Sequence, residues 1–128
     1  LETASQAANH SMFVPSQTAM LAAGNQKKAW NYIELFYHEQ GDENDSYVTD
    51  NYLGGLAKQV QGLNFSQWSS DRNSSTLSGQ VNGDMSSAAA AGYNSTPTIL
   101  VSGPKSQAQP LVGDQPYSAL QTAIKQVS

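Results

Sequence analysis

The chain has 128 residues, 38% of them hydrophobic and 12% charged, which is long enough for one domain with a core of its own. Its formal net charge is −4, and its six Lys and Arg residues are scattered apart from the pair Lys27-Lys28. A phosphate-binding surface needs clustered cations and a bilayer span needs roughly 20 consecutive apolar residues, so we expect neither nucleic acid as a partner nor a membrane span in this chain.

Five helices are expected before residue 92. Pro15 suits the first turn of a helix that runs to about Ala23, with Gly24 as its stop. The strongest helix pattern then covers residues 26–40. A third helix is capped by Thr49 or Asp50 and ended by Gly62, a short one is capped by Asn64, and a fifth begins at Ser74 or Ser75 and is stopped by Gly92.

The helix over residues 26–40 is expected to be the main core helix. Its large residues recur at helical spacing, which predicts a deeply buried face rather than an aromatic ligand site. The residues on that face are Ala29, Trp30, Ile33, Phe36, Tyr37 and Gln40. In the third helix, Gly54-Gly55 suggests close packing against another helix or a small kink.

No metal site is expected. Asp42, Asn44 and Ser46 alternate as calcium ligands do, but Tyr47 stands where a calcium-binding EF-hand loop needs glycine and Leu53 where it needs glutamate. The acidic loop over residues 41–46 is therefore interpreted as a solvated loop. His10 and His38 lie too far apart in sequence to indicate a metal site, and no cofactor is expected.

A short strand follows the pair Thr96-Pro97. The β-branched run over residues 98–102 ends at a Gly-Pro turn, and proline suits the start of a strand because it donates no backbone hydrogen bond. A second short strand over residues 110–113 is expected to pair with it as an antiparallel hairpin. A last helix begins at Pro116, and its apolar stripe is Tyr117, Leu120, Ile124 and Val127.

This order of elements resembles the DsbA-like thiol-disulfide oxidoreductases of the thioredoxin superfamily, especially those of actinobacterial type. The residues that carry the resemblance are Gly92 to Val101, Leu111-Val112-Gly113 and Pro116 to Leu120, with Ser95 where the family usually has glycine. The implied fold class is α+β, mostly α: a partial thioredoxin-like domain of DsbA type. Residues of about 1–92 would form its helical-bundle insert, and residues of about 93–128 would supply its short β-hairpin and C-terminal helix.

The resemblance also implies a site and a location. Ser95, Thr96 and Pro97 would form the cis-proline loop, where the backbone of Thr96 pairs with an extended segment of a protein substrate. The family works on secreted and cell-envelope proteins of bacteria, so an extracytoplasmic location is expected. The family's Cys-x-x-Cys would precede Leu1, and with no cysteine in these residues the chain contains no catalytic residue for redox chemistry. We therefore expect a fragment that is inactive alone.

Three functions stay open at this point. The chain is part of a thiol-disulfide oxidoreductase, or a non-catalytic thioredoxin-like module that binds peptides, or a helical extracellular domain unrelated to redox chemistry. A further expectation concerns the strand over residues 98–102. Its second edge would be uncovered in this chain, which favours dimerisation or pairing with another segment.

Overall fold

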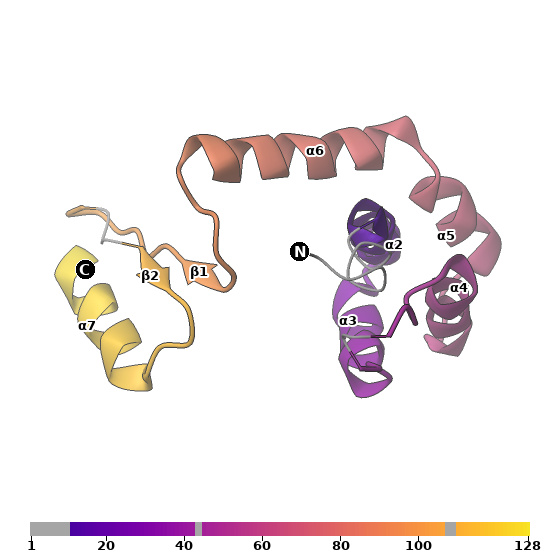
Figure 1. The fold of residues 1–128 in the computed structure, drawn as a ribbon, viewed down its shortest axis with the longest axis horizontal. Coiled ribbons are helices and arrows are strands. Elements are labelled where there is room, and N and C mark those ends of the chain that lie inside the picture. The colour runs from indigo at the N-terminus through magenta and orange to yellow at the C-terminus, as the bar shows by residue number, and fades with distance from the viewer. Residues whose placement is uncertain (1–10, 43–44, 107–109) are drawn as a thin grey trace. The chain divides into compact units, whose positions relative to one another are not determined.

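The computed structural model describes residues 11–42, 45–106 and 110–128. The chain divides into two compact units, residues 1–85 and residues 86–128, and the division falls inside a helix, α6. Within the described ranges, no helix is both long enough and apolar enough to span a membrane. The expected class, mostly α with a small sheet, is confirmed. The elements shown in Figure 1 are α2 (Phe13–Asn25), α3 (Ala29–His38), α4 (Asp50–Gln59), α5 (Phe65–Arg72), α6 (Ser75–Ala90), β1 (Thr98–Ile99), β2 (Leu111–Val112) and α7 (Tyr117–Val127).

Helix α2 is the centre of the first unit, because it packs against α3, α4 and α5. Its buried face consists of small residues, so the neighbouring helices can approach its backbone closely. These residues are Thr18, Ala19, Ala22 and Ala23. The large side chains that fill the space around them come from the other helices, and they are Tyr32, Leu53, Leu56 and Trp68.

Two buried aromatic residues fasten these helices together through hydrogen bonds. The indole N–H of Trp68 donates to the carbonyl of Ala19 at 2.8 Å, which joins α5 to α2. The hydroxyl of Tyr32 donates to the carbonyl of Leu53 at 3.0 Å, which joins α3 to α4. Burial disfavours a charged phenolate and raises the pKa of Tyr32 well above its usual value. Each ring therefore buries a large apolar area with its polar atom satisfied.

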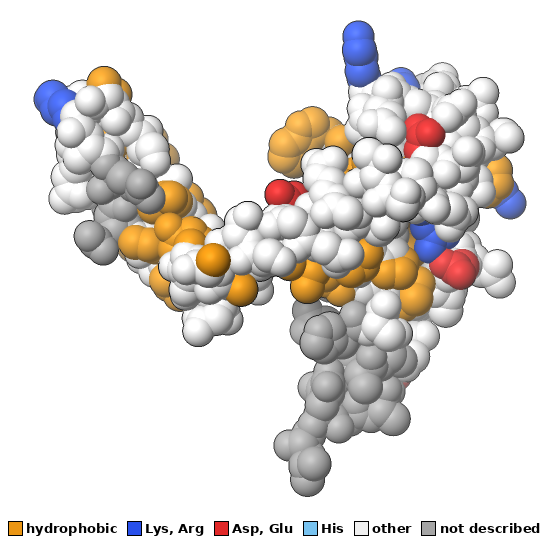
Figure 2. Space-filling view, turned by 90° about the horizontal axis from the view of Figure 1, so that it is seen from above, with side chains coloured by type: hydrophobic (Ala, Val, Ile, Leu, Met, Phe, Trp, Pro, Cys, Tyr) orange, Lys and Arg blue, Asp and Glu red, His pale blue; other side chains and the backbone are white. Residues whose placement is uncertain are grey.

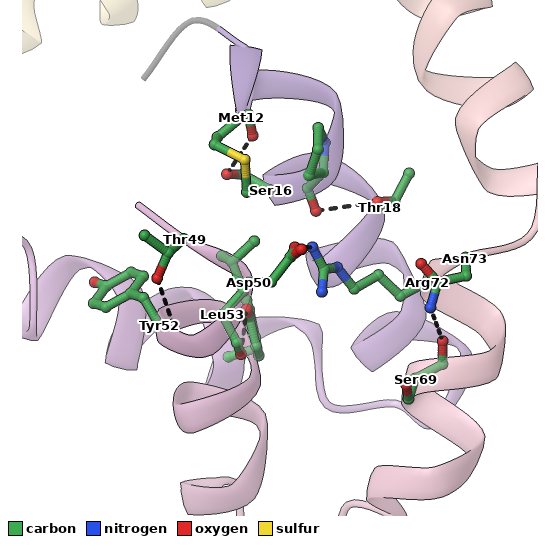
Figure 3. Close-up of polar contacts among 12 residues, drawn as sticks. Met12, Ser16, Thr18, Thr49, Asp50, Tyr52, Leu53, Ser69, Arg72 and Asn73 are labelled. Atoms are coloured by element: carbon green, nitrogen blue, oxygen red, sulfur yellow. Dashed lines mark hydrogen bonds and ion pairs between the residues drawn. The ribbon is translucent and has the colours of Figure 1, made fainter. Parts of the chain in front are cut away.

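The expected caps of α4 and α5 are confirmed. The N–H of Tyr52 donates to the Thr49 hydroxyl at 3.1 Å, and the N–H of Gln67 donates to the side-chain oxygen of Asn64 at 3.0 Å. Figure 3 shows the Thr49 cap beside the ion pair in which Arg72 donates to Asp50. That ion pair links the last turn of α5 to the first turn of α4, where a carboxylate also suits the helix dipole.

The end of α2 differs from the expectation. Gly24 does not stop the helix, which continues to Asn25, and Lys27 takes the left-handed conformation with a φ of 59°. The N–H of Lys27 donates to the carbonyl of Gly24, and that of Lys28 donates to the carbonyl of Ala23. This pair of bonds is a Schellman ending with lysine where glycine is usual. A Cβ at Gly24 would lie at an ordinary contact distance, 3.7 Å, from that of Ala29, so packing does not require glycine here.

The expectation of deep burial along α3 is wrong for two of its aromatic residues. Trp30 is 76% exposed and Tyr37 is 68% exposed, whereas Tyr32 is 1% exposed. The apolar side chains of this helix point in most directions around its axis, so their spacing is compatible with more than one buried face. The face that packs is the one through Tyr32, whose hydroxyl finds a partner in α4.

The glycine pair of α4 is only partly explained by packing. A Cβ on Gly54 would lie 3.8 Å from the ring of Phe65, in agreement with the predicted approach of a second helix. A Cβ on Gly55 would meet nothing within 4 Å. Gly55 therefore weakens the helix with no packing benefit.

Replacing Gly55 with alanine is expected to raise the free energy of unfolding by about 1 kcal/mol, because alanine loses less backbone entropy on forming a helix. Chemical denaturation followed by far-UV circular dichroism measures the change. The matched control is Gly62→Ala, since Gly62 has a φ of +76°. That variant should lose stability, and a gain at position 62 or a loss at position 55 would contradict the described backbone.

The second unit has a small core and one hairpin. Ala123 and Val127 of α7 are buried against Val101 and Leu111. The antiparallel hairpin predicted from the sequence is present, with Thr98 opposite Val112 and Ile99 opposite Leu111. Strand β1 ends at Ile99 and does not reach residue 102, and its partner in the described sheet, β2, is equally short.

Candidate functional site

The loop of Ser95, Thr96 and Pro97 joins the end of α6 to β1. Helix α6 stops at a second Schellman ending, in which Gly92 has a φ of +76° and the N–H of Tyr93 donates to the carbonyl of Ala88. The chain then turns and presents all three loop residues to solvent. The sequence therefore positions the loop with a glycine stop on one side and a hairpin on the other.

The hairpin holds the C-terminal side of this loop. The peptide bond between Thr96 and Pro97 is cis. The N–H of Gly113 donates to the carbonyl of Pro97 at 2.8 Å, which extends the ladder by one position beyond β1. Pro97 has no N–H that could donate back to the carbonyl of Gly113. The pair Pro97–Gly113 therefore makes one backbone hydrogen bond, where two other residues would make two. The hydroxyl of Thr98 donates to the carbonyl of Ser95 and closes the loop from within.

Thr96 is the residue whose backbone is left open. It is exposed, and no described residue hydrogen-bonds its N–H or its carbonyl. Its neighbours Ser95 and Pro97 both have a bonded carbonyl. An extended chain that passes Thr96 can therefore form backbone hydrogen bonds of the kind that add a strand to a sheet.

A small hollow of about 180 Å³ lies beside the loop. Its walls come from the loop after α6 and from the second strand of the hairpin. Sequence reasoning did not predict this hollow, because it depends on how the hairpin register brings Pro110 and Val112 next to Tyr93. The lining residues are Ala91, Gly92, Tyr93, Asn94, Ser95, Thr98, Pro110 and Val112.

The other candidate chemistry of the sequence yields no site in the described part of the chain. No group of three or more His, Asp or Glu side chains there could hold a metal ion. Asn44 of the acidic loop and His10 lie outside the described residues. The sequence has no cysteine, so the loop at Thr96 has no thiol of this chain to work with.

Comparison with known proteins gives one result. A family model described as thioredoxin matches residues 7–126, which is nearly the whole chain. No curated protein and no solved structure matches the chain significantly. The match and the observed hairpin argue against a helical domain of unrelated fold. They support the thioredoxin-like fold but do not distinguish the DsbA-like branch. The chain belongs to the thioredoxin family.

Proposed function

We propose that this chain is the helical and substrate-facing part of a protein thiol-disulfide oxidoreductase of DsbA type. The observation that carries the proposal is the open backbone of Thr96 in an exposed loop, held between a helix stop and a hairpin. The family match supports a redox-related role in general terms.

The loop residues have separate tasks in this proposal. The N–H and carbonyl of Thr96 pair with the backbone of an extended substrate segment on one side of its cysteine. Pro97 has no N–H, so it cannot donate a backbone hydrogen bond to the substrate in place of Thr96. The carbonyl of Ser95 is occupied by the Thr98 hydroxyl, which holds the loop in shape. Backbone pairing of this kind accepts many substrate sequences, as a general disulfide enzyme requires.

The redox step is assigned to a Cys-x-x-Cys pair on a segment outside these residues. A thiolate of that pair attacks a substrate disulfide, one substrate sulfur leaves as a thiolate, and a mixed disulfide forms. The second cysteine then attacks the mixed disulfide, which releases the reduced substrate and leaves the pair oxidised; disulfide formation is the reverse sequence. We place the complete protein outside the cytoplasm, where disulfides persist.

Strand β1 offers a further surface for completing the fold. Its described partner is β2 on one edge, and Ile99 and Leu100 are 39% and 37% exposed. Val112 is 52% exposed on the partner strand. An uncovered edge with apolar side chains favours pairing with another strand. We assign this edge to the cysteine-bearing segment, with a second copy of this chain as the alternative occupant.

The test compares two substitutions at one position. The probe is a capped, extended peptide whose central cysteine is S-methylated, titrated against the chain and followed by amide chemical shifts. Shifts are expected at residues 95–98. Thr96→Ala keeps the backbone N–H and should bind within about twofold of the unchanged chain. Thr96→Pro removes that N–H and should weaken binding by about tenfold or more, because one hydrogen bond to the peptide and the strand pairing that depends on it are lost.

Two results would contradict the proposal. Equal losses for Thr96→Ala and Thr96→Pro would mean that the backbone does not carry recognition. The segment encoded before Leu1 gives the second test, in an exchange assay on a disulfide-linked peptide with that segment attached. Absence of a Cys-x-x-Cys there would reject the oxidoreductase and leave a peptide-binding module, whereas its presence with Thr96-dependent exchange supports the proposal.

A further inference from the structure

Helix α3 exposes two large aromatic side chains on its outer surface. Trp30 is 76% exposed and Tyr37 is 68% exposed. They are seven residues apart, two helical turns, so they lie on the same side of α3 and about 10 Å apart along its axis. Hydrophobic side chains are visible at the surface of the first unit in Figure 2. Exposed aromatic residues grouped in this way mark interaction surfaces.

An apolar hollow of about 170 Å³ adjoins this aromatic ridge. It lies between α2 and α3, and Tyr37 forms part of its wall. Met20, Ile33 and Phe36 supply most of its apolar lining, while Ser16 and Gln17 supply polar atoms at its edge. A hollow of this kind suits one apolar side chain of a partner that rests on the ridge.

The charge around the ridge determines the partner. Glu34 lies between Trp30 and Tyr37 on the exposed side of α3, and no described residue forms a hydrogen bond or ion pair with its carboxylate. Helix α3 itself contains no Lys or Arg, and Glu39 adds a second carboxylate one residue beyond its end, next to His38. The C-terminal end of α3 adds the negative end of its helix dipole. Lys27 and Lys28 precede the helix on its Trp30 side, so the negative charge of this surface extends from Glu34 toward the Tyr37 end, beside the two aromatic rings.

We propose that this ridge binds a basic segment of a partner protein, in which a Lys or Arg lies next to an apolar residue. The cation pairs with Glu34 and rests against the rings of Trp30 and Tyr37, which attract cations through their faces. The apolar neighbour fills the hollow between α2 and α3. This surface is separate from the Ser95–Pro97 loop, so it concerns partner binding and not the substrate pairing proposed above.

A second copy of the chain is a poorer occupant. The net charge of each copy is −4, and helix α3 carries no Lys or Arg that could pair with Glu34 of another copy, so two such faces would not complement one another. A basic partner is attracted to the face from a distance, and that attraction weakens with salt.

The experiment measures the binding of a fluorescein-labelled peptide to the complete chain by anisotropy. The probe is a capped peptide of the repeat Leu-Arg-Ser, and two companion probes replace Arg by Glu or Leu by Ser. Both replacements should weaken binding by about tenfold or more. Trp30→Ala and Tyr37→Ala should each weaken it by about tenfold, and Glu34→Gln by about fivefold. Raising salt from about 50 mM to about 500 mM should also weaken it.

Matched controls come from the same chain. Tyr117 is 73% exposed on α7, and Asp84 is exposed on α6, so Tyr117→Ala and Asp84→Asn remove the same kinds of group elsewhere. Both should bind the probe within about twofold of the unchanged chain. The proposal is overturned if Glu34→Gln has no effect, if the controls weaken binding as much, or if the chain binds itself and not the peptide. Loss of binding on Thr96→Pro, with none on Trp30→Ala, would assign the peptide to the loop instead.

Discussion

Replacing Trp68 with alanine is expected to lower the free energy of unfolding by about 3–5 kcal/mol, the range for removing a large buried aromatic side chain. Trp68 is 1% exposed. Its ring stacks on that of Phe65 with centroids 5.5 Å apart and lies 6.1 Å from that of Tyr32. Its indole N–H also donates to Ala19. The substitution removes all of these contacts and leaves a cavity where α2 meets α5.

The chain's other tryptophan is the control for this prediction. Trp30→Ala should change stability by less than about 0.5 kcal/mol, because the side chain is 76% exposed and surface substitutions have small effects. Trp68→Phe separates packing from hydrogen bonding and should lose about 1–2 kcal/mol. Urea denaturation followed by far-UV circular dichroism measures all three variants. Similar losses at positions 30 and 68 would contradict the packing described for the first unit.

The parts of the fold that the sequence predicts well are those that depend on neighbouring residues. Thr49 and Asn64 cap their helices because a short side-chain oxygen reaches an N–H three residues later, whatever lies beyond. Gly92 ends α6 for an equally local reason, its positive φ. The hairpin follows from two short apolar runs separated by a turn. None of these features needs knowledge of the tertiary structure.

The features that could not be predicted depend on contacts between distant segments. Tyr32 is buried and Trp30 is exposed because α3 packs against α2 and α4 through the face that carries Tyr32. Lys27, and not Gly24, takes the positive φ, because α2 continues past Gly24 and its terminal hydrogen bonds run from Lys27 and Lys28. Spacing along a single helix does not show which of its faces packs against another helix.

The candidate site shows the same division. The positions of Ser95, Thr96 and Pro97 between a helix stop and a strand follow from the local sequence. The openness of the Thr96 backbone depends on which groups the hairpin register satisfies, and Gly113 bonds to Pro97 and not to Thr96. The hollow beside the loop depends on Pro110 and Val112, which lie more than ten residues away in the sequence.

The second large effect is expected from Gly103→Ala. A Cβ at this position would overlap the carbonyl oxygen of Val127 and lie 2.8 Å from its Cγ2. The loop after β1 rests directly on the end of α7 here, and the N–H of Lys105 donates to the same carbonyl at 3.2 Å. A methyl group would push the loop away from Val127, which is one of the two buried residues of α7. Overpacking of this kind lowers the free energy of unfolding by about 1–3 kcal/mol, which is a large loss for a unit with so small a core.

Hydrogen exchange is the suitable measurement, because the effect should be confined to the second unit. Amides of α7 should lose protection by about ten- to a hundredfold in Gly103→Ala, while those of α2 and α5 should keep theirs. Gly79→Ala is the matched control, since a Cβ on Gly79 meets nothing within 4 Å. The double variant Gly103→Ala with Val127→Ala adds a further constraint. It relieves the overlap with Cγ2 but not the overlap with the backbone oxygen, so the protection of the α7 amides should not return. Its return would show that the loop does not approach the helix backbone as closely as described.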